Sequence, residues 1–431
     1  MKYRFLTKLV TSLMLLCTLV VPISAARAAE LLSLEQAVAM ALASNPSLAA
    51  IEARAQALAT VPDQSGALPD PSLSLNLVNL PLDSFSFTQE AMTQFQIGIS
   101  QVLPYPGKLA LRSQMATQEA DSAKSDVHEK RLQLIRDVKT VWWNFFYLDR
   151  ALEVVARNQN LLGQTVQVSE TRYRVGQGQQ QDILLAQLEL TKLRDVTLRL
   201  LNMRDNEAAR LNLLLDRSTA TPFQLPAKVD EALPILTTAA SLQERARELR
   251  PTLAAQQRLI DAARSRVDLA KKEYFPEFKV GAVYGLRGGT NPDGSSRADF
   301  GSFIFSMSLP LYASSKQDRA VDQRNAEFLQ KKYQLHDQRN QVAAEVQQAL
   351  TDYQRAAEQA QLFSQEIIPQ ARQTVDAMLA GYQVGKVDFL SLLRSQTTLY
   401  DYESQYWKAL SVAHQAHARL VAAVGEDNIY E

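Results

Sequence analysis

The apolar positions of this chain follow two kinds of pattern, and the first repeats every three and four residues. Between residues 138 and 173, nine of the eleven positions at this spacing are apolar or aromatic, the exceptions being Gln159 and Ser169. The spacing returns later at Val342, Val346, Ala349, Tyr353, Ala356, Ala360, Phe363 and Ile367. Such a seam is typical of helices that pack side by side, as in a coiled coil. The pattern therefore predicts long paired helices.

The second pattern is an alternation of apolar with polar or small residues. It predicts four strands, at about 72–80, 94–103, 277–286 and 301–311, each with one apolar face. A transmembrane β-strand has this weak signature, and so has a half-buried strand of a soluble sheet. The side chains assigned to the lipid-facing side are Leu73, Leu75, Leu77, Phe95, Ile97, Ile99, Phe278, Val280, Tyr284, Phe303, Phe305 and Met307.

Proline separates the two kinds of region. There is none between Lys108 and Thr221, and only Pro369 lies between Ala313 and Glu431. Because proline interrupts helices, these stretches are predicted to be helical, at about 108–175, 180–216, 314–382 and 388–425. The first of these helices would extend about 100 Å, far longer than an ordinary domain accommodates.

The same order of elements occurs twice. Asn45-Pro46-Ser47-Leu48 recurs as Arg250-Pro251-Thr252-Leu253, a shift of 205 (251 − 46), and Tyr173-x-Val175-Gly176 recurs as Tyr382-x-Val384-Gly385, a shift of 209 (382 − 173). We therefore expect two tandem units, 29–216 and 241–425, each with a short helix, two strands and two long helices. The segment 217–240 is expected to wrap the middle of the molecule, and 426–431 forms a tail.

Residues 1–28 have the layout of a secretory signal peptide, with basic residues, an apolar run and then small residues. The only cysteine, Cys17, lies in this leader, so neither a disulfide nor a lipid anchor is expected in the mature chain. The full chain has 46 Lys+Arg and 46 Asp+Glu, and removal of the leader leaves a net charge near −4 (42 − 46). This balance gives no reason to expect a nucleic-acid partner.

Four strands leave two open edges, and open edges cannot stand in lipid. Closure would require several chains, with two giving eight strands and three giving twelve. Three copies are favoured, because an eight-stranded barrel is filled by its own side chains. If the strands were instead soluble hairpins, the chain would be a periplasmic structural or adaptor coiled-coil protein.

These features together resemble the TolC family of bacterial outer-membrane channel proteins. The resemblance covers the leader, the duplicated unit, the strands, the paired helices and the Asn45-Pro46-Ser47-Leu48 opening. It implies a mainly α fold with a small transmembrane β part, in which a homotrimer joins a twelve-stranded β-barrel to a long periplasmic α-helical barrel. It further implies a passive exit duct of a tripartite efflux or secretion system, with a periplasmic adaptor and an inner-membrane pump as partners. It implies no catalytic site and no cofactor.

The resemblance is most specific at the turns between paired helices. Arg172-Tyr173-Arg174-Val175-Gly176, followed by Asp182, and Gly381-Tyr382-Gln383-Val384-Gly385 are similar to the family's two turn motifs. The implied adaptor-docking tips are Val175, Gly176, Gly178, Val384, Gly385 and Lys386, and the implied periplasmic gate consists of Asp182, Tyr382, Ser391 and Arg394. A hydrogen bond between Asp182 and Tyr382 is the expected latch. The alternative is that Asp182 caps the returning helix and Tyr382 packs in the seam.

Other signals carry less weight. His414 and His417 are three residues apart, which suits one metal ion, but with no third ligand in sight we expect a packed or solvated pair. The aromatic cluster 142–147 is expected to wedge neighbouring helices. Pro106-Gly107-Lys108 fits a strand-to-helix bend, and it is also similar to family members that accompany heavy-metal efflux pumps. No catalytic constellation at useful spacing supports a secreted enzyme.

Overall fold

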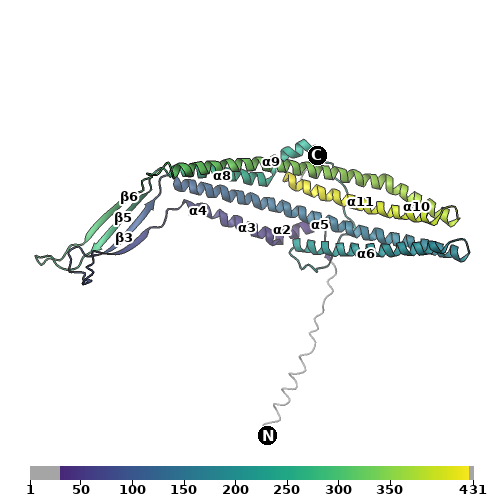
Figure 1. Ribbon diagram of the computed structural model, residues 1–431, viewed down its shortest axis with the longest axis horizontal. Helices are drawn as coiled ribbons and strands as arrows, with labels where there is room; N and C mark the ends of the chain where they lie inside the picture. Colours follow the sequence, from purple (N-terminus) through teal and green to yellow (C-terminus); the bar gives the residue numbers. More distant parts are fainter. Residues whose placement is uncertain (1–29, 427–431) are drawn as a thin grey trace, which may run out of the picture.

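The computed structural model describes residues 30–426. The predicted signal peptide 1–28, and all of the predicted tail except Glu426, lie outside the described residues. The chain forms one elongated body with strands at one end and two helical hairpins at the other (Figure 1). The mainly helical fold with a four-stranded sheet confirms the predicted fold class.

The first half of the chain contains β1 (Glu30–Leu31), α2 (Leu34–Ser44), α3 (Pro46–Ala59), α4 (Val61–Gly66), β2 (Ser72–Val78), β3 (Gln94–Leu103), α5 (Lys108–Arg174) and α6 (Gln180–Leu214). The remainder contains β4 (Phe223–Gln224), α7 (Ala239–Leu249), α8 (Pro251–Lys272), β5 (Phe278–Leu286), β6 (Phe300–Met307), α9 (Gln317–Leu362), η1 (Phe363–Ile367), α10 (Ile368–Gln383) and α11 (Phe389–Val424).

The longest helix, α5, runs without a break for 67 residues because no proline interrupts it. It begins after Gly107, which has φ +90, and it ends just before Gly176, which has φ +74. Its seam faces the interior over most of its length, and the buried seam positions are Val138, Val141, Phe145, Leu148, Val155, Leu162 and Ser169. Near the tip the seam turns outward, and Tyr173 is exposed.

The helix predicted over 314–382 is not a single α-helix. α9 begins at Gln317 and gives way at Phe363 to η1, a π-helical turn of five residues that leads into α10. Pro369 gives the physical reason. It has no N–H to offer the carbonyl of Gln365, and its ring would clash with that carbonyl in a regular helix. A widened turn accommodates both effects.

One short helix was expected in each unit, and this prediction was wrong. The first unit has three short helices, α2, α3 and α4, and the second has two helices before its strands, α7 and α8. The breaks between α2 and α3 and between α7 and α8 fall at Asn45 and Arg250, each of which precedes a proline and is extended, with φ −65. A following proline disfavours the helical region, so the helix must stop and restart.

The four longer strands form one antiparallel sheet in the order β2-β3-β5-β6. Directly opposite residues point to the same side of a sheet. Because Leu75 faces Ile97, and Ile97 faces Tyr284, the apolar side chains of successive strands share one face. β2 stops at Val78 because Asn79 has φ +55. β6 stops at Met307, earlier than predicted, ahead of Pro310, which cannot donate to a ladder.

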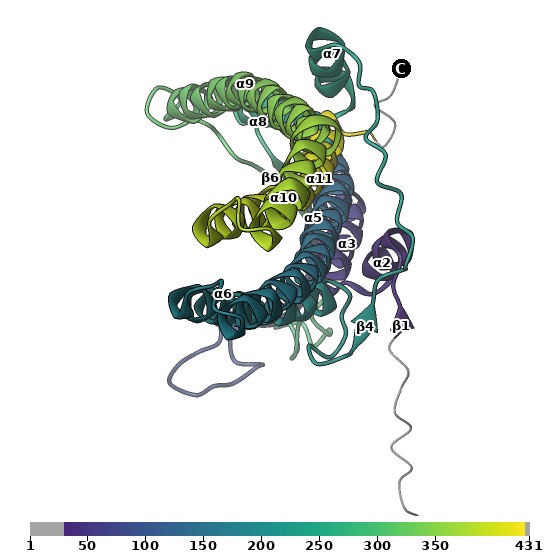
Figure 2. The ribbon, with the colours of Figure 1, turned by 90° about the vertical axis from the view of Figure 1, so that its right-hand side faces the viewer.

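The start of the described chain is tied to the segment between the units. β1 pairs in parallel with β4, and the N–H of Leu32 donates to the carbonyl of Gln224 at 2.9 Å. Trp142 Nε1 donates to the carbonyl of Leu32 at 3.1 Å. From β4, the linking segment runs along the outer side of the helices to α7 (Figure 2). The two-residue strands were not predicted, because two residues are too short for an alternation.

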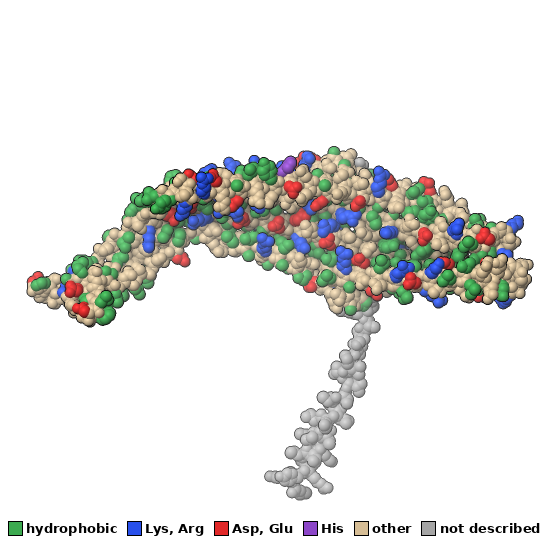
Figure 3. Space-filling model, in the orientation of Figure 1, with side chains coloured by type: hydrophobic (Ala, Val, Ile, Leu, Met, Phe, Trp, Pro, Cys, Tyr) green, Lys and Arg blue, Asp and Glu red, His purple; other side chains and the backbone are tan. Residues whose placement is uncertain are grey.

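Seen along its length, the helical part is an arc with one open side (Figure 2). α5 packs against α6, α8 and α11, and α9 packs against α8 and α11. Charged side chains are spread along the helical part, whereas the sheet shows mostly apolar and other uncharged side chains (Figure 3). In the part of the chain that the structure describes, no helix is both long enough and apolar enough to cross a membrane.

Candidate functional site at the helical tips

Both helical hairpins reverse their direction at a glycine. In each turn the glycine N–H and the N–H that follows it bond back to carbonyls of the ending helix, which is the pattern of a Schellman motif. Gly176 has φ +74 and Gly385 has φ +76, a conformation that glycine adopts at little cost. Glycine is favoured at 178 for a different reason, since a Cβ there would lie only 3.0 Å from Arg172 Cβ and from the backbone nitrogen of Tyr173.

The remaining predicted tip residues are on the surface. Val175 is 63% exposed and Val384 is 68% exposed. Lys386, directly after the second turn glycine, is exposed as well. Two apolar side chains therefore project into solvent at the end of the molecule farthest from the sheet (Figure 1).

Tyr382 connects the second hairpin to the first, and it is only 3% exposed. Its hydroxyl lies 3.0 Å from Ser169 Oγ on α5 and donates to Asp182 Oδ2 on α6 at 3.4 Å. The guanidinium of Arg172 lies over the ring, 4.6 Å from its centroid, and donates to the carbonyl of Tyr382. The structure thus brings the predicted pair Asp182 and Tyr382 together. The ring also packs edge-on against Phe389, so Tyr382 makes seam contacts in addition to its hydrogen bond with Asp182.

The electrostatics of this cluster keep the phenol neutral. Burial raises the pKa of Tyr382 above its ordinary value of 10.0, and the neighbouring carboxylate of Asp182 raises it further, while Ser169 and Arg172 act in the opposite direction. The hydroxyl is therefore protonated at neutral pH and can serve as a donor. Asp182 lies in the first turn of α6, where the helix dipole favours a negative charge.

The other two predicted gate residues have different surroundings. The N–H and Oγ of Ser391 bond the carboxylate of Asp388, at 2.9 and 2.7 Å, and this contact caps α11 and lowers the pKa of Asp388. Arg394 is exposed and, with Ser391, lines a cleft of about 500 Å³ between α10 and α11. Within one protomer, Ser391 and Arg394 lie in this cleft instead of joining the contacts around Tyr382.

Several residues at the tips were missed by sequence reasoning. Ser169 did leave a signal, since it is a polar residue within an apolar seam, and Arg172 lies inside the turn motif. Thr165 and Gln396 also join the hairpins, with Nε2 of Gln396 donating to Oγ1 of Thr165 at 2.8 Å in a buried position. No signal was available for this pair, because the two residues are 231 positions apart.

The twelve side chains assigned to lipid all lie on one face of the sheet, as the strand register requires. Ten of them are exposed, and Phe95 and Phe278 are partly buried. Phe303 is 94% exposed and Phe305 is 66% exposed, values unusual for phenylalanine in contact with water. A continuous apolar face of this kind marks a surface that something else covers.

The bend between sheet and helices is fixed by a buried lysine. Lys108 is 1% exposed, and its Nζ lies 3.1 Å from Glu273 and 3.0 Å from Glu277 in the second unit. Beside it, the rings of Tyr105 and Phe275 stack with centroids 4.3 Å apart. Pro106-Gly107-Lys108 therefore forms a junction that holds the two units together where strands meet helices.

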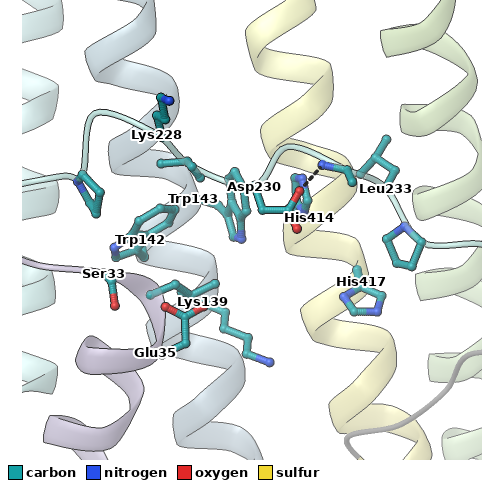
Figure 4. A pocket seen from close by; sticks show the side chains of 15 residues that line it. Ser33, Glu35, Lys139, Trp142, Trp143, Lys228, Asp230, Leu233, His414 and His417 are labelled. Carbon is teal, nitrogen blue, oxygen red and sulfur yellow. Dashed lines mark hydrogen bonds between the residues drawn. The ribbon is translucent and has the colours of Figure 1, made fainter.

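At the waist, a cavity of about 460 Å³ lies between α2, α5, α11 and the linking segment (Figure 4). His414 stacks on Trp143, with ring centroids 3.7 Å apart. Burial lowers the pKa of both His414 and His417 to about 4, so both are neutral at pH 7. Among residues 30–426, no three His, Cys, Asp or Glu side chains gather closely enough to hold a metal ion.

Comparisons with known proteins agree with this architecture. The cobalt-zinc-cadmium resistance protein CzcC of Cupriavidus metallidurans is 22% identical over 418 residues, which cover 95% of this chain and 93% of CzcC. The outer membrane protein VceC of Vibrio cholerae superposes with a TM-score of 0.76 at 19% identity, covering 91% of this chain and 96% of VceC.

The open state of the MtrE outer membrane channel of Neisseria gonorrhoeae superposes with a TM-score of 0.76 at 17% identity, covering 91% of this chain and 89% of MtrE. The family model described as outer membrane efflux protein matches residues 37–217 and 242–426, which correspond to the two units. The chain therefore belongs to the outer membrane efflux protein family.

Proposed function

We propose that this protein, an outer-membrane efflux channel and not an enzyme, works as a homotrimeric exit duct with a gate at its helical tips. One observation carries the proposal: the same protomer combines a sheet that has one apolar face with an arc of long helices. In this arrangement the sheet lies in the outer membrane, and the helices extend through the periplasm.

The shape of the protomer supports assembly from several copies. Within the described residues, β2 and β6 each pair with a single strand, so both edges of the sheet are open. Lipid offers no hydrogen bonds to such edges. Three copies would supply twelve strands, enough for a barrel with a lumen, and would close the helical arc into a tunnel. The mass of the detergent-solubilised complex tests this directly: three copies are expected, and a dimer or a monomer would overturn the trimer.

The contacts of Tyr382 support a gate that is held shut by polar bonds between the hairpins. A hydrogen bond to an ionised acceptor contributes roughly 1.5 to 3 kcal/mol, and the donor–acceptor distance of 3.4 Å to Asp182 places this one at or below the lower end. Such a bond holds the closed state and still yields to a partner. In a trimer, three symmetry-related copies of this hydrogen bond would together stabilise the closed state.

The gate is tested by the double substitution Asp182→Ala and Tyr382→Phe in planar bilayers. Removing the bond should raise the mean conductance several-fold, because the hairpins can then separate. The matched control is Gln159→Ala with Thr197→Ala, which removes a 3.0 Å hydrogen bond inside the first hairpin and should leave conductance unchanged. Equal conductance of the double variant and the native protein would reject the gate.

The exposed valines support docking of a periplasmic adaptor at the tips. Exposure of the apolar side chains of Val175 and Val384 to water is unfavourable unless another protein covers them. The variant Val384→Asp should abolish cross-linking to the adaptor that links the duct to an inner-membrane pump. Exposed Leu329, far from the tips on α9, supplies the control position, and Leu329→Asp should leave that cross-link intact.

The relation to CzcC supports divalent metal cations as one class of cargo. Pro106-Gly107-Lys108 agrees with this assignment, since it is similar to members that accompany heavy-metal pumps. Deletion of the gene should lower tolerance of cobalt, zinc and cadmium, and the native chain should restore it. Unchanged metal tolerance together with lost tolerance of organic drugs would assign the duct to drug efflux.

A further inference from the structure

The cavity at the waist lies on the outer side of the helical arc. It is bounded by α2, α5, α11 and the linking segment, and that segment runs along the outside of the helices (Figure 2, Figure 4). A periplasmic solute can therefore reach the cavity without entering the proposed tunnel. The volume of about 460 Å³ is within the range of small-molecule binding sites.

The floor of this cavity is aromatic and contains a polar atom without a partner. Trp142 and Trp143 are buried, and the ring of His414, which is 8% exposed, stacks on Trp143. In the part of the chain that the structure describes, no hydrogen bond reaches Nε2 of His414. A buried polar atom without a hydrogen bond is unfavourable, so a ligand atom that bonds this nitrogen would be stabilised.

Four charged side chains line the same cavity. Glu35 lies in the first turn of α2, Lys139 is on α5, and Lys228 and Asp230 belong to the linking segment (Figure 4). Among the described residues, none of the four forms an ion pair, although both signs of charge are present. Asp230 accepts from the N–H of Ala232 at 3.0 Å through Oδ1 alone. Opposite charges that line one cavity and stay apart can bind separate groups of one ligand.

Lys139 carries the positive charge that most needs a partner. Its side chain is partly buried, whereas Glu35, Lys228 and Asp230 are exposed. Burial and then the charge of Lys139 lower the pKa of His417 to about 4, so the ammonium group lies near that ring. A partly buried cation without an anionic partner is unfavourable. A carboxylate that enters the cavity would supply this partner.

We propose that the waist cavity binds a zwitterion, namely an amino acid or a short peptide with both ends free. Lys139 and Lys228 bind its carboxylate. Glu35 and Asp230 bind its ammonium group, and the aromatic floor covers its carbon atoms. The bound ligand bridges α2, α5 and the linking segment, and so holds that segment against the helices. This site lies apart from the duct and from its tip gate, and it depends on neither.

Isothermal titration calorimetry of the mature protein in detergent tests the site, with dialanine as the probe. N-acetyl-dialanine lacks the ammonium group and dialanine amide lacks the carboxylate. Each should bind roughly tenfold more weakly than dialanine, because one set of charge-assisted hydrogen bonds is lost. Equal binding of all three compounds, or no binding of dialanine, would overturn the proposal and would leave the exit duct and its gate standing. Free alanine that binds as tightly as dialanine would support the site and identify its ligand as a single amino acid.

Two variants test the residues that bind the carboxylate. Lys139→Gln should weaken dialanine binding roughly tenfold, and Lys228→Gln, which changes an exposed side chain without disturbing packing, should weaken it as well. The matched control is Lys130→Gln, since Lys130 is a partly buried lysine of α5 that does not line the cavity. Its affinity for dialanine should equal that of the native protein. Native affinity in both cavity variants, once circular dichroism shows that they are folded, would reject the site.

Discussion

The first long helix and its counterpart in the second unit occupy equivalent places but pack through different side chains. In α5 the waist carries Trp142, which is 1% exposed and lies in the largest aromatic cluster of the core. The buried seam of α5 matches that of α9 at a shift of 208, with Val138 at Val346 and Phe145 at Tyr353, so Trp142 corresponds to the aliphatic Leu350 (142 + 208). The second unit instead uses small and aliphatic residues such as Val346 and Ala349 at its helix contacts.

This difference shows how a duplicated sequence can divide two tasks. Large aromatic rings fill space rigidly and give α5 contacts that change little. Small residues let helices approach closely, and Pro369 with η1 interrupts the regular hydrogen-bond ladder of the second hairpin. The first unit thus supplies a rigid aromatic frame at the waist, and the second unit supplies close helix contacts.

The largest expected effect on stability comes from removing the aromatic packing of α5 at the waist. Trp142→Ala deletes a buried indole that packs on Trp143 and Phe146 and bonds the carbonyl of Leu32. Such a loss costs about 3–5 kcal/mol, and the melting temperature in detergent, followed by circular dichroism, should fall accordingly. Leu350→Ala, at the buried counterpart in α9, removes a smaller side chain and should lower the melting temperature less. Equal effects at the two positions would show that the units do not differ in this way.

Low pH should destabilise the protein through a buried histidine of the second unit at the waist. The shift of 209 aligns His414 with Asp205 (414 − 209), so the buried histidine occurs only in the second unit. Burial lowers its pKa to about 4, below the ordinary 6.5, so the unfolded chain binds the proton more readily. The contribution of His414 to stability is therefore complete above pH 6.5 and is lost as the pH falls through 4, by roughly 3 kcal/mol for the full shift.

Denaturation in detergent between pH 7 and pH 4 measures this dependence. The variant His414→Gln should have a shallower decline than the native protein, since one of the groups that titrates is gone. His128, on the first unit's α5, provides the control, and His128→Gln should keep the native slope. A native slope in His414→Gln would show that the buried ring does not govern acid stability.

The smallest effect is expected at Asn45, the cap at the opening of the first unit. Asn45 caps α3, with Oδ1 accepting from the N–H groups of Ser47 and Leu48, and Asn45→Ala should cost about 1 kcal/mol. Its counterpart Arg250 has no capping bond and instead forms a buried bidentate pair with Glu129. Thermal melting should therefore show a modest shift for Asn45→Ala and a larger one for Arg250→Ala, because the latter leaves a buried carboxylate unpaired.

Much of this fold was open to prediction because its signals are local. Alternation along the strands correctly identified the apolar face, since each side chain's direction follows from the pleat. Turn motifs located both helical reversals, because a Schellman turn depends on a glycine at one position. The same locality explains the failures at Asn45 and Arg250, where a proline one residue ahead restarted a helix within an otherwise helical pattern.

At the tips, the sequence and the family resemblance predicted that Asp182 and Tyr382 lie together. They also assigned Ser391 and Arg394 to the same periplasmic gate. The motif fixes positions along each helix, whereas the facing side chains depend on how two hairpins rotate against each other. Ser391 instead bonds Asp388 in the local cap of α11, and the packing of α10 against α11 places Arg394 in the cleft between them.

The amino-acid sequence by itself determined the extents of α5, α6 and α11, the position and sidedness of the four longer strands, the duplication and the family. These properties follow from periodicity, proline placement and backbone preference, which act over a few residues at a time. Only the tertiary structure decided that Glu403 holds arginines from two other helices, and that β1 pairs with β4. Contacts between distant residues arise from three-dimensional packing, and no linear pattern along one segment records which partner the other segment presents.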